Sequence, residues 1–294
     1  MKIERTLLKT ILICERCGGD FSQTETALTC SRCNHVVREE DGKFFFSSVP
    51  GDIQPFDKRE RGPDIGTPWR RANWKFLQQQ VEQIPPETII LDVGAGRGDF
   101  VTLFEQRNYL TLDIYPYPQV DIVCDLTKIM PFRPQSMDAI ILMNVLEHVY
   151  NSHELFAAFA KMLAPGGKLI VAIPFLLKLH QTPYDFVRYT HHALQKLGED
   201  HHLTLSHLEG YYDPAFILGE GINHLKYNVV PAIPKPKHYF LRAVLLGLEV
   251  QKRLLQIGLG NGQAVHPDHT PNPAPVGYQV VYTRTTAGAT HFEG

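Results

Sequence analysis

The sequence predicts an α/β protein with a mainly parallel sheet covered on both faces, preceded by a small N-terminal module. Apolar, strand-like segments alternate with helix-like segments from residue 88 onward, a glycine-rich turn follows the first of these strands, and two close cysteine pairs precede residue 34. Such alternation is typical of parallel sheets. The 294 residues, 44% of them hydrophobic and 20% charged, with a net charge of −2, suit one folded domain of ordinary size and a small addition.

The N-terminal module contains four cysteines in two C-x2-C pairs separated by twelve residues. Two thiolates at this spacing reach one ion from a tight turn, and Gly18-Gly19 supplies the backbone freedom that such a turn needs. The segments around Leu28 and from Lys43 to Phe46 are strand-like, and His35 is expected on the surface. We therefore predict a zinc ribbon over residues 1–49, folded by its ion. The ligands are Cys14, Cys17, Cys30 and Cys33.

A linker is expected to join this ribbon to the main domain. Residues 50–68 are rich in proline, glycine and charged residues, and the main domain is predicted over residues 69–294. Its first helix has Thr67 as the N-cap and Pro68 in the first turn, and it ends before Pro85-Pro86.

The main domain is predicted to hold seven strands and their connecting helices. Most of the strands are continuous apolar runs, which indicates a parallel sheet that is buried on both faces. The predicted strands are Thr88 to Val93, Tyr109 to Asp113, Asp121 to Cys124, Met137 to Met143, Lys168 to Ile173, Leu203 to Glu209 and Gly277 to Arg284, and the predicted helices between them are Asp99 to Arg107, Ser152 to Leu163 and His191 to Glu199.

An insertion over residues 213–276 precedes the last strand. It is predicted to contain an amphipathic helix from Tyr239 to Ile257, on which Leu241 and Leu245 share a face. The polar side of this helix is not rich in Lys and Arg, so we expect it to cap the active site, with peripheral membrane contact as the alternative.

The segment that indicates chemistry most strongly is ILDVGAGRGDF, residues 90–100. Its glycines are spaced G-x-G-x-G, whereas a dinucleotide-binding turn has G-x-G-x-x-G, and position 99 is Asp. Glycines between a strand and a helix let the backbone approach a ligand closely, and the start of the helix offers unpaired N–H groups. The turn therefore suits a ligand that carries a carboxylate.

With this motif the chain resembles the class I S-adenosylmethionine-dependent methyltransferases, of the type 11-like group. The resemblance extends from Thr88 to about Tyr212 and returns in the last strand; SMDAIILMNVLEHVYN and MLAPGGKLIVAIP complete the family pattern. It implies a Rossmann-like, seven-stranded sheet with S-adenosylmethionine at the carboxyl ends of the strands.

The same resemblance implies which residues hold the cofactor. Asp92 would lie near the methionine amino group, and Asp113 would accept both ribose hydroxyls, for which a carboxylate has the two oxygens. Asp125 and Leu126 match the pair that contacts adenine. The remaining cofactor candidates are Gly94, Ala95, Gly96 and Gly98 in the turn, Ile114 after the second strand and Asn144 after the fourth.

Two loops are expected to face the methyl group, residues 144–149 and 174–190, because they follow the fourth and fifth strands. In the first, Glu147 and His148 are candidates for a base or for metal ligands, and similar Glu-His pairs bind a divalent ion in some quinone O-methyltransferases. Because Asn144 stands where a further acid would help, we expect His148 to be a structural or cofactor-side contact.

The second loop contains HQTPYDFVRYT, which resembles a loop of many methyltransferases in this group. On a functional interpretation His180 is the base, since its ordinary pKa lies near neutrality, and Arg188 anchors an acidic or polar acceptor. On a structural interpretation Asp185 pairs with Arg188 to hold the loop, and Thr190 caps the next helix.

The sequence therefore predicts an enzyme that methylates a small-molecule or lipid-like acceptor. One alternative is an RNA methyltransferase whose ribbon grips nucleic acid, which predicts a basic surface from the ribbon through Lys58 to Arg71; the chain as a whole has no basic surplus. Another alternative is a non-catalytic protein that binds the cofactor or docks a partner. We expect a cytoplasmic protein, since neither a signal peptide nor a transmembrane run is recognisable.

Overall fold

The computed structural model describes residues 5–23, 27–49, 66–259 and 274–285. Their strands form a single sheet of 11 strands in the order β1-β2-β3-β4-β7-β6-β5-β8-β9-β11-β10. The strands are β1 (Phe21–Gln23), β2 (Ala27–Cys30), β3 (Val36–Glu40), β4 (Lys43–Phe45), β5 (Ile89–Val93), β6 (Asn108–Asp113), β7 (Ile122–Val123), β8 (Met137–Met143), β9 (Leu163–Pro174), β10 (Leu203–Tyr211) and β11 (Gly277–Arg284).

Strands β5 to β11 form the predicted seven-stranded sheet, and its Rossmann-like fold is confirmed. The strands β7, β6, β5, β8 and β9 are parallel neighbours, and β11 lies antiparallel between β9 and β10. The helices are α1 (Arg5–Ile11), α2 (Pro68–Glu82), η1 (Val101–Phe104), η2 (Leu146–His148), α3 (Ser152–Met162), α4 (His191–Glu199), α5 (Pro214–His224), η3 (Leu225–Val229), η4 (Val230–Ala232) and α6 (Lys237–Leu259).

The central strands are apolar throughout because helices cover both of their faces. Successive residues of β5 point into different cores: Ile90 packs in a cluster with Phe76 of α2, and Leu91 packs in a cluster with Phe156 of α3 and Leu194 of α4. This alternation follows from the two-residue period of a strand. All five of these side chains are buried, so the continuous apolar pattern reflects burial on both sides.

The predicted helix from Asp99 to Arg107 is wrong. After Gly98 the chain forms tight turns and then the short 3-10 helix η1. The N–H of Gly98 donates to Ala95 O at 2.9 Å and that of Val101 to Gly98 O at 3.1 Å, which is the i to i−3 spacing of a tight turn. Gln106, with φ of 68°, then turns the chain into β6 before an α-helix could form.

The other predicted helices are present with small changes at their ends. Helix α2 begins as expected, since the Thr67 hydroxyl accepts the Arg70 N–H at 3.3 Å and Pro68 stands in the first turn. Helix α6 contains the whole predicted amphipathic helix. Helix α5 was not predicted from the sequence; Asp213 caps it by accepting the Phe216 N–H at 2.8 Å.

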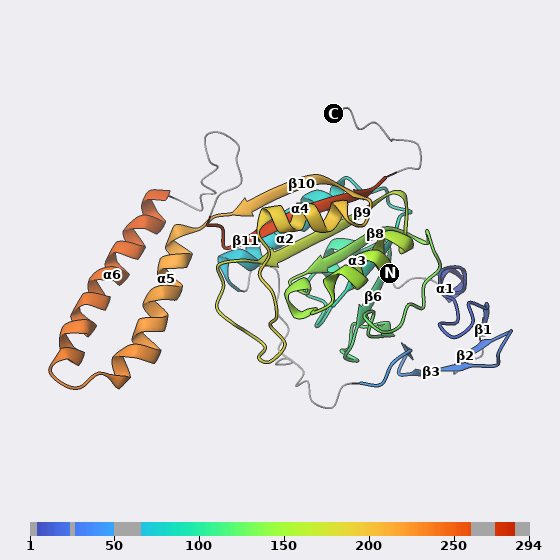
Figure 1. Cartoon of the computed structure of the whole chain (residues 1–294), viewed down its shortest axis with the longest axis horizontal. Helices are drawn as coiled ribbons and strands as arrows, with labels where there is room; N and C mark the ends of the chain where they lie inside the picture. Colours follow the sequence, from blue (N-terminus) through green and yellow to red (C-terminus); the bar gives the residue numbers. More distant parts are fainter. Residues whose placement is uncertain (1–4, 24–26, 50–65, 260–273, 286–294) are drawn as a thin grey trace.

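Helices α5 and α6 form a hairpin that projects from the sheet, at the opposite end of the molecule from the ribbon (Figure 1). A small apolar cluster of Ile222, Val230 and Leu245 holds the two helices together. Several apolar side chains of α6 are exposed, among them Phe240 (71%) and Ile257 (80%). Within the described part of the chain, no helix combines the length and the apolarity that a bilayer span requires.

The ribbon is an extension of the main sheet. Strand β4 pairs in parallel with β7, and Phe44 N donates to Asp121 O and Phe46 N to Val123 O, both at 2.9 Å. The ribbon side chains Leu28 and Phe44 belong to the same core cluster as the main-domain strands. The predicted linker, residues 50–68, lies mostly outside the described residues. A rigid attachment of the ribbon therefore comes from strand pairing and a shared core.

This attachment can be tested by removing the aromatic side chain of Phe44, which lies in the shared core. We expect Phe44→Ala to lower the free energy of unfolding by about 3–5 kcal/mol, because the side chain is 3% exposed and lies in the shared core. The matched control Val36→Ala removes a ribbon side chain that is 53% exposed, and it should change the free energy by less than about 0.5 kcal/mol. Urea unfolding followed by circular dichroism measures both. Equal, small effects would contradict the shared core.

Candidate active site

The glycine turn lies at the carboxyl end of β5. Gly94, Gly96 and Gly98 have φ angles of 72°, 55° and 76°, which residues other than glycine rarely adopt. A Cβ on Gly94 would lie 2.4 Å from Cγ2 of Val145, whereas one on Gly96 would meet nothing nearer than 3.9 Å. Gly94 thus permits close packing against the loop after β8, and Gly96 leaves the backbone open to a ligand.

Asp113 connects this turn to the end of β6. Its Oδ2 accepts the Gly96 N–H and its Oδ1 accepts the Tyr115 N–H, both at 2.9 Å. The residue is 8% exposed, and burial raises the pKa of its carboxyl group. Each oxygen retains a lone pair for a further donor. The carboxylate is therefore fixed in orientation and able to accept two hydroxyls, and Ile114 follows it directly.

Asp92 is the acid at the end of β5, with 2% exposure. Burial, together with the charges of Asp113 and Asp99, raises its pKa to about 7, although the hydrogen bond from the Tyr109 hydroxyl acts in the opposite direction. A carboxyl group that titrates near neutrality becomes ionised when a cation is placed beside it. Asp92 is thus suited to receive an ammonium group from a ligand.

One further acid, one leucine and one amide follow the neighbouring strands β7 and β8. Asp125, after β7, accepts the Thr127 hydroxyl at 2.5 Å and lies 2.8 Å from Lys128 Nζ; these partners hold the pKa of Asp125 below its ordinary value although burial opposes this. Leu126, beside it, is buried. Asn144 has φ of 56°, and its Oδ1 accepts the Trp69 indole N–H at 2.8 Å.

The start of α2 closes over the same turn, which the sequence did not reveal. The Arg70 guanidinium pairs with the Asp99 carboxylate, and Trp69 contacts Asn144 as described above. The only available signal was the helix start at Thr67, because neither Trp69 nor Arg70 belongs to a motif. The structure thus joins Asp113 to the glycine turn by a hydrogen bond, Asp92 precedes that turn in β5, and α2 ties Asn144 to the same edge.

The loops after β8 and β9 form a second group of polar side chains. Glu147 is completely buried, and its Oε1 lies 3.5 Å from His180 Nε2 and 3.7 Å from His148 Nε2. The Glu147 carboxylate raises the pKa of His180 above its ordinary value, which favours the imidazolium form. A general base must be neutral, so this contact opposes the role of His180 as a base when nothing else is bound.

Asp185 and Arg188 are occupied within their own loop. Asp185 Oδ2 lies 2.8 Å from Arg188 Nη2 and accepts the His180 backbone N–H at 2.9 Å. Arg188 lowers the pKa of Asp185 to about 2. Thr190 Oγ1 accepts the Ala193 N–H at 3.2 Å and so caps α4. The pairing and the cap that the structural interpretation predicts are both present, while anchoring of an acceptor by Arg188 stays a prediction.

The four ribbon cysteines converge on one point. Their sulfur atoms lie within 4.8 Å of one another, with Cys14 to Cys33 at 3.6 Å and Cys17 to Cys30 at 3.5 Å. Four thiolates around a tetrahedral zinc ion would stand about 3.8 Å apart, so the residues fit this ion. A Cβ on Gly19 would lie 3.0 Å from Cys30 Sγ, which explains the glycine.

His35 is not the surface residue that the sequence suggested. Its side chain is 15% exposed, and its Nε2 lies 2.6 Å from Glu15 Oε1. It thus packs beside the cysteine cluster, paired with an acid. The group of four thiols does not include it.

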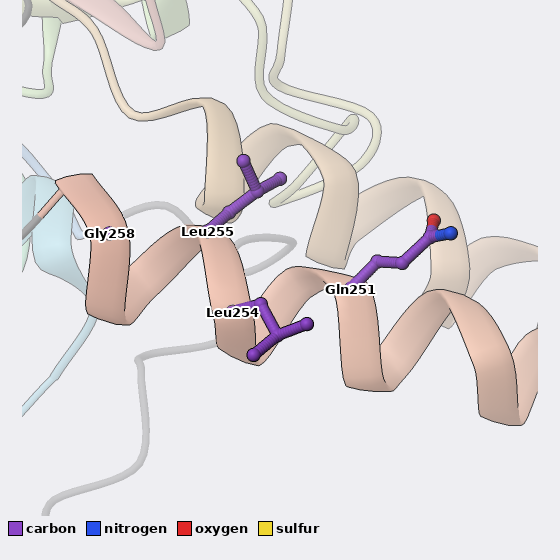
Figure 2. A pocket seen from close by; sticks show the side chains of 4 residues that line it. All are labelled: Gln251, Leu254, Leu255 and Gly258. Carbon is purple, nitrogen blue, oxygen red and sulfur yellow. The ribbon is translucent and has the colours of Figure 1, made fainter.

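A hollow on α6 has a volume of about 490 Å³. Figure 2 shows its lining side chains, which are Gln251, Leu254 and Leu255, with Gly258 at one end. None of these residues can transfer a proton or carry a charge. The polar groups described above, at the strand ends, are the candidate active site.

Residues 68–209 match the family described as "Methyltransferase domain". "Probable tRNA methyltransferase 9B" from Mus musculus is 31% identical to this chain over 112 residues, which is 34% of this chain and 25% of the relative. "tRNA (carboxymethyluridine(34)-5-O)-methyltransferase ALKBH8" from Macaca fascicularis is 26% identical over 115 residues, 35% of this chain and 17% of the relative.

A third relative is the "Demethylmenaquinone methyltransferase" of Renibacterium salmoninarum. It is 26% identical over 132 residues, which is 41% of this chain and 55% of the relative. The chain thus spans about a quarter of the length of the mouse relative and about half that of the bacterial one.

Zinc in the cysteine cluster can be tested by removing one ligand. We expect Cys30→Ser to lose one zinc ion per chain relative to the unchanged protein, because three ligands hold the ion poorly. Cys124→Ala is the matched control, since Cys124 is also fully buried but lies outside the cluster, and it should keep its zinc. Elemental analysis of protein never exposed to chelator measures this. Equal zinc contents in both variants would contradict the assignment.

The role of Asp113 can be tested by cofactor binding. We expect Asp113→Ala to weaken S-adenosylmethionine binding by about 1–3 kcal/mol, because the two ribose hydroxyls would lose the acceptor that the family resemblance implies. Asp138→Ala is the control: this exposed acid accepts the Ile89 N–H at 2.9 Å at the opposite end of β5. Calorimetric titration compares the two. Unchanged affinity in a folded Asp113 variant would mean that the cofactor binds elsewhere.

Proposed function

We propose that this chain, in which residues 68–209 form a methyltransferase domain, transfers a methyl group from S-adenosylmethionine to an acceptor beside the loop of residues 174–190. The observation that carries the proposal is the link between the open glycine turn and Asp113, through the 2.9 Å bond from Gly96. This link fixes a carboxylate next to exposed backbone at the carboxyl edge of a parallel sheet, where ligands of such sheets bind.

The residues at this edge match the chemistry of the cofactor. Asp92 receives the methionine ammonium group, Asp113 accepts the ribose hydroxyls, and the backbone at Gly96 lies along the ligand. Asp125 and Leu126 border the adenine. In the reaction a lone pair of the acceptor forms a bond to the methyl carbon as the carbon–sulfur bond breaks, and the electron pair stays on sulfur in S-adenosylhomocysteine. The protein mainly orients the three atoms in line.

We propose RNA, and tRNA in particular, as the acceptor. Two of the relatives are named as tRNA methyltransferases, and this supports RNA over the small molecule that the sequence favoured. The ribbon extends the sheet from β7, next to Asp125, so an RNA could contact ribbon and active site together. The basic surface expected for this function runs through Lys58, which lies outside the described residues.

A lipid-like acceptor is the second candidate. It is favoured by the exposed apolar side chains of α6 and by the relative named as a demethylmenaquinone methyltransferase. The α5–α6 hairpin begins at the same edge of the sheet as the candidate active site. Strand β10 runs in the same direction as β9, so both strands end at that edge, and β10 leads directly into α5. An ion pair joins the hairpin to the loop of residues 174–190, since Lys178 Nζ lies 3.2 Å from Glu220 Oε2 of α5.

Labelled cofactor separates these acceptors. The protein is incubated with methyl-labelled S-adenosylmethionine and with separate RNA, lipid, protein and small-metabolite fractions of its host. We expect label in the RNA fraction, with transfer that falls as salt rises, because phosphate contacts release counterions. Asp113→Ala serves as the control that should label weakly.

The other outcomes are equally decisive. Label in the lipid fraction alone would support the second candidate and contradict an RNA acceptor. Cofactor binding without label in any fraction would favour the non-catalytic alternative.

A further inference from the structure

Glu147, His148 and His180 form a group that methyl transfer itself does not require. One carboxylate oxygen and two imidazole nitrogens lie within 4.8 Å of one another. Glu147 and His148 belong to η2, after β8, and His180 belongs to the loop after β9. The three side chains therefore come from two loops that meet at the carboxyl edge of the sheet.

Glu147 is a buried charge without an adequate partner. Its side chain has no exposed surface, and neither carboxylate oxygen has a hydrogen-bond partner among the described residues. A buried carboxylate that accepts no hydrogen bond is strongly unfavourable unless a cation pairs with it, and the ion-pair partners of Glu147 are two imidazoles, which are charged only when protonated. The backbone of Glu147 is nevertheless fixed, because its carbonyl accepts the Phe186 N–H at 2.9 Å. The loop thus holds the acid in a position that requires a cation.

His148 is oriented as a metal-binding histidine. Its Nδ1 lies 2.6 Å from the carbonyl oxygen of Tyr184, so Nδ1 carries the proton and donates. The neutral ring then has its lone pair on Nε2, which is buried, lacks a hydrogen-bond partner in the described structure, and lies 3.7 Å from Glu147 Oε1. A backbone carbonyl that fixes the far nitrogen is the usual support for an imidazole ligand.

His180 completes the group, although its Nδ1 makes no hydrogen bond among the described residues. Its Nδ1 lies 3.2 Å from Asp185 Oδ2 and its Nε2 lies 3.5 Å from Glu147 Oε1. Asp185 is itself held by Arg188, as described above, so the carboxylate behind the ring is fixed. The side chain of His180 is 27% exposed, compared with 14% for His148, and one side of the group is therefore open to solvent.

We propose that Glu147, His148 and His180 bind a divalent transition-metal ion, with an open coordination position on the side of His180. Two imidazole nitrogens and one carboxylate oxygen suit zinc and its neighbours in the first row, whereas magnesium and calcium prefer oxygen ligands alone. The ion would pair with the buried charge of Glu147. His180 would then act as a ligand through Nε2 and would not be the base.

The open position gives the ion a role that rests on the proposed function. An acceptor hydroxyl bound there loses its proton to solvent more easily, since a bound cation lowers the pKa of an oxygen ligand. The resulting oxygen forms the bond to the methyl carbon, the carbon–sulfur bond breaks, and the products are a methyl ether and S-adenosylhomocysteine. The proposed site therefore suits an oxygen nucleophile, such as a ribose hydroxyl of RNA.

Zinc titration of the full chain, with the cysteine cluster already filled, tests the site. The unchanged protein should take up one zinc ion beyond that of the cluster. Glu147→Gln and His180→Ala should bind this additional ion more than about 100-fold more weakly, because each loses a direct ligand. Calorimetry and elemental analysis after dialysis give the affinity and the stoichiometry. If Glu147→Gln fails to fold, the partly exposed His180 still provides the test.

His153→Ala is the matched control. His153 Nδ1 lies 3.2 Å from His201 Nε2 on the surface, so this variant removes an imidazole from a different pair. It should keep the additional zinc ion. Uptake that is lost in His153→Ala and retained in His180→Ala would assign the ion to the surface pair and overturn the proposal.

The titration is independent of methyl transfer, so the two proposals can fail separately. Zinc uptake that requires Glu147 and His180, in a protein that methylates no fraction, would leave the metal site standing without the proposed function. An unchanged protein that transfers methyl groups but takes up no zinc beyond the cluster would overturn the metal site alone.

Discussion

The parallel pairing of β5, β6, β7, β8 and β9 is the constraint on which the rest of the structure depends. Parallel strands must all end at the same edge of the sheet, so the residues that follow them meet there whatever their distance in sequence. Asp92, Asp113 and Asp125 end or follow three of these strands, and Glu147 follows a fourth. Four acidic residues therefore lie at this edge, and their negative charges require partners that stabilise them.

Each of these carboxyl groups has a different set of neighbouring groups. Asp113 is fixed by two backbone N–H groups, and Asp125 by Thr127 and Lys128. Among the described residues Asp92 accepts a hydrogen bond only from the Tyr109 hydroxyl, and its pKa rises to about 7. Glu147 has imidazole rings nearby but no hydrogen bond among the described residues. The two acids that are least satisfied by the protein are thus the ones to which we assign cations, the cofactor ammonium group and a metal ion.

The two additions to the sheet are attached in different ways. The ribbon continues the sheet through β4 and shares its core, so the cysteine cluster has a fixed position relative to the active site. The α5–α6 hairpin packs mainly on itself and leaves apolar side chains of α6 exposed (Figure 1). A rigid ribbon at one end and an apolar hairpin at the other give the two candidate acceptors, RNA and a lipid-like molecule, different surfaces to contact.

The sequence by itself determined the features that depend on local patterns: apolar runs fixed the main-domain strands within a few residues, the glycine spacing located the turn, and the cysteine spacing located the thiol cluster. It failed at Asp99 to Arg107, where tight turns after the glycines left too little chain for a helix. Only the tertiary structure placed His180 against Glu147, Trp69 against Asn144 and β4 beside β7. These contacts join segments whose sequences carry no sign of one another, because sheet order and loop path decide them.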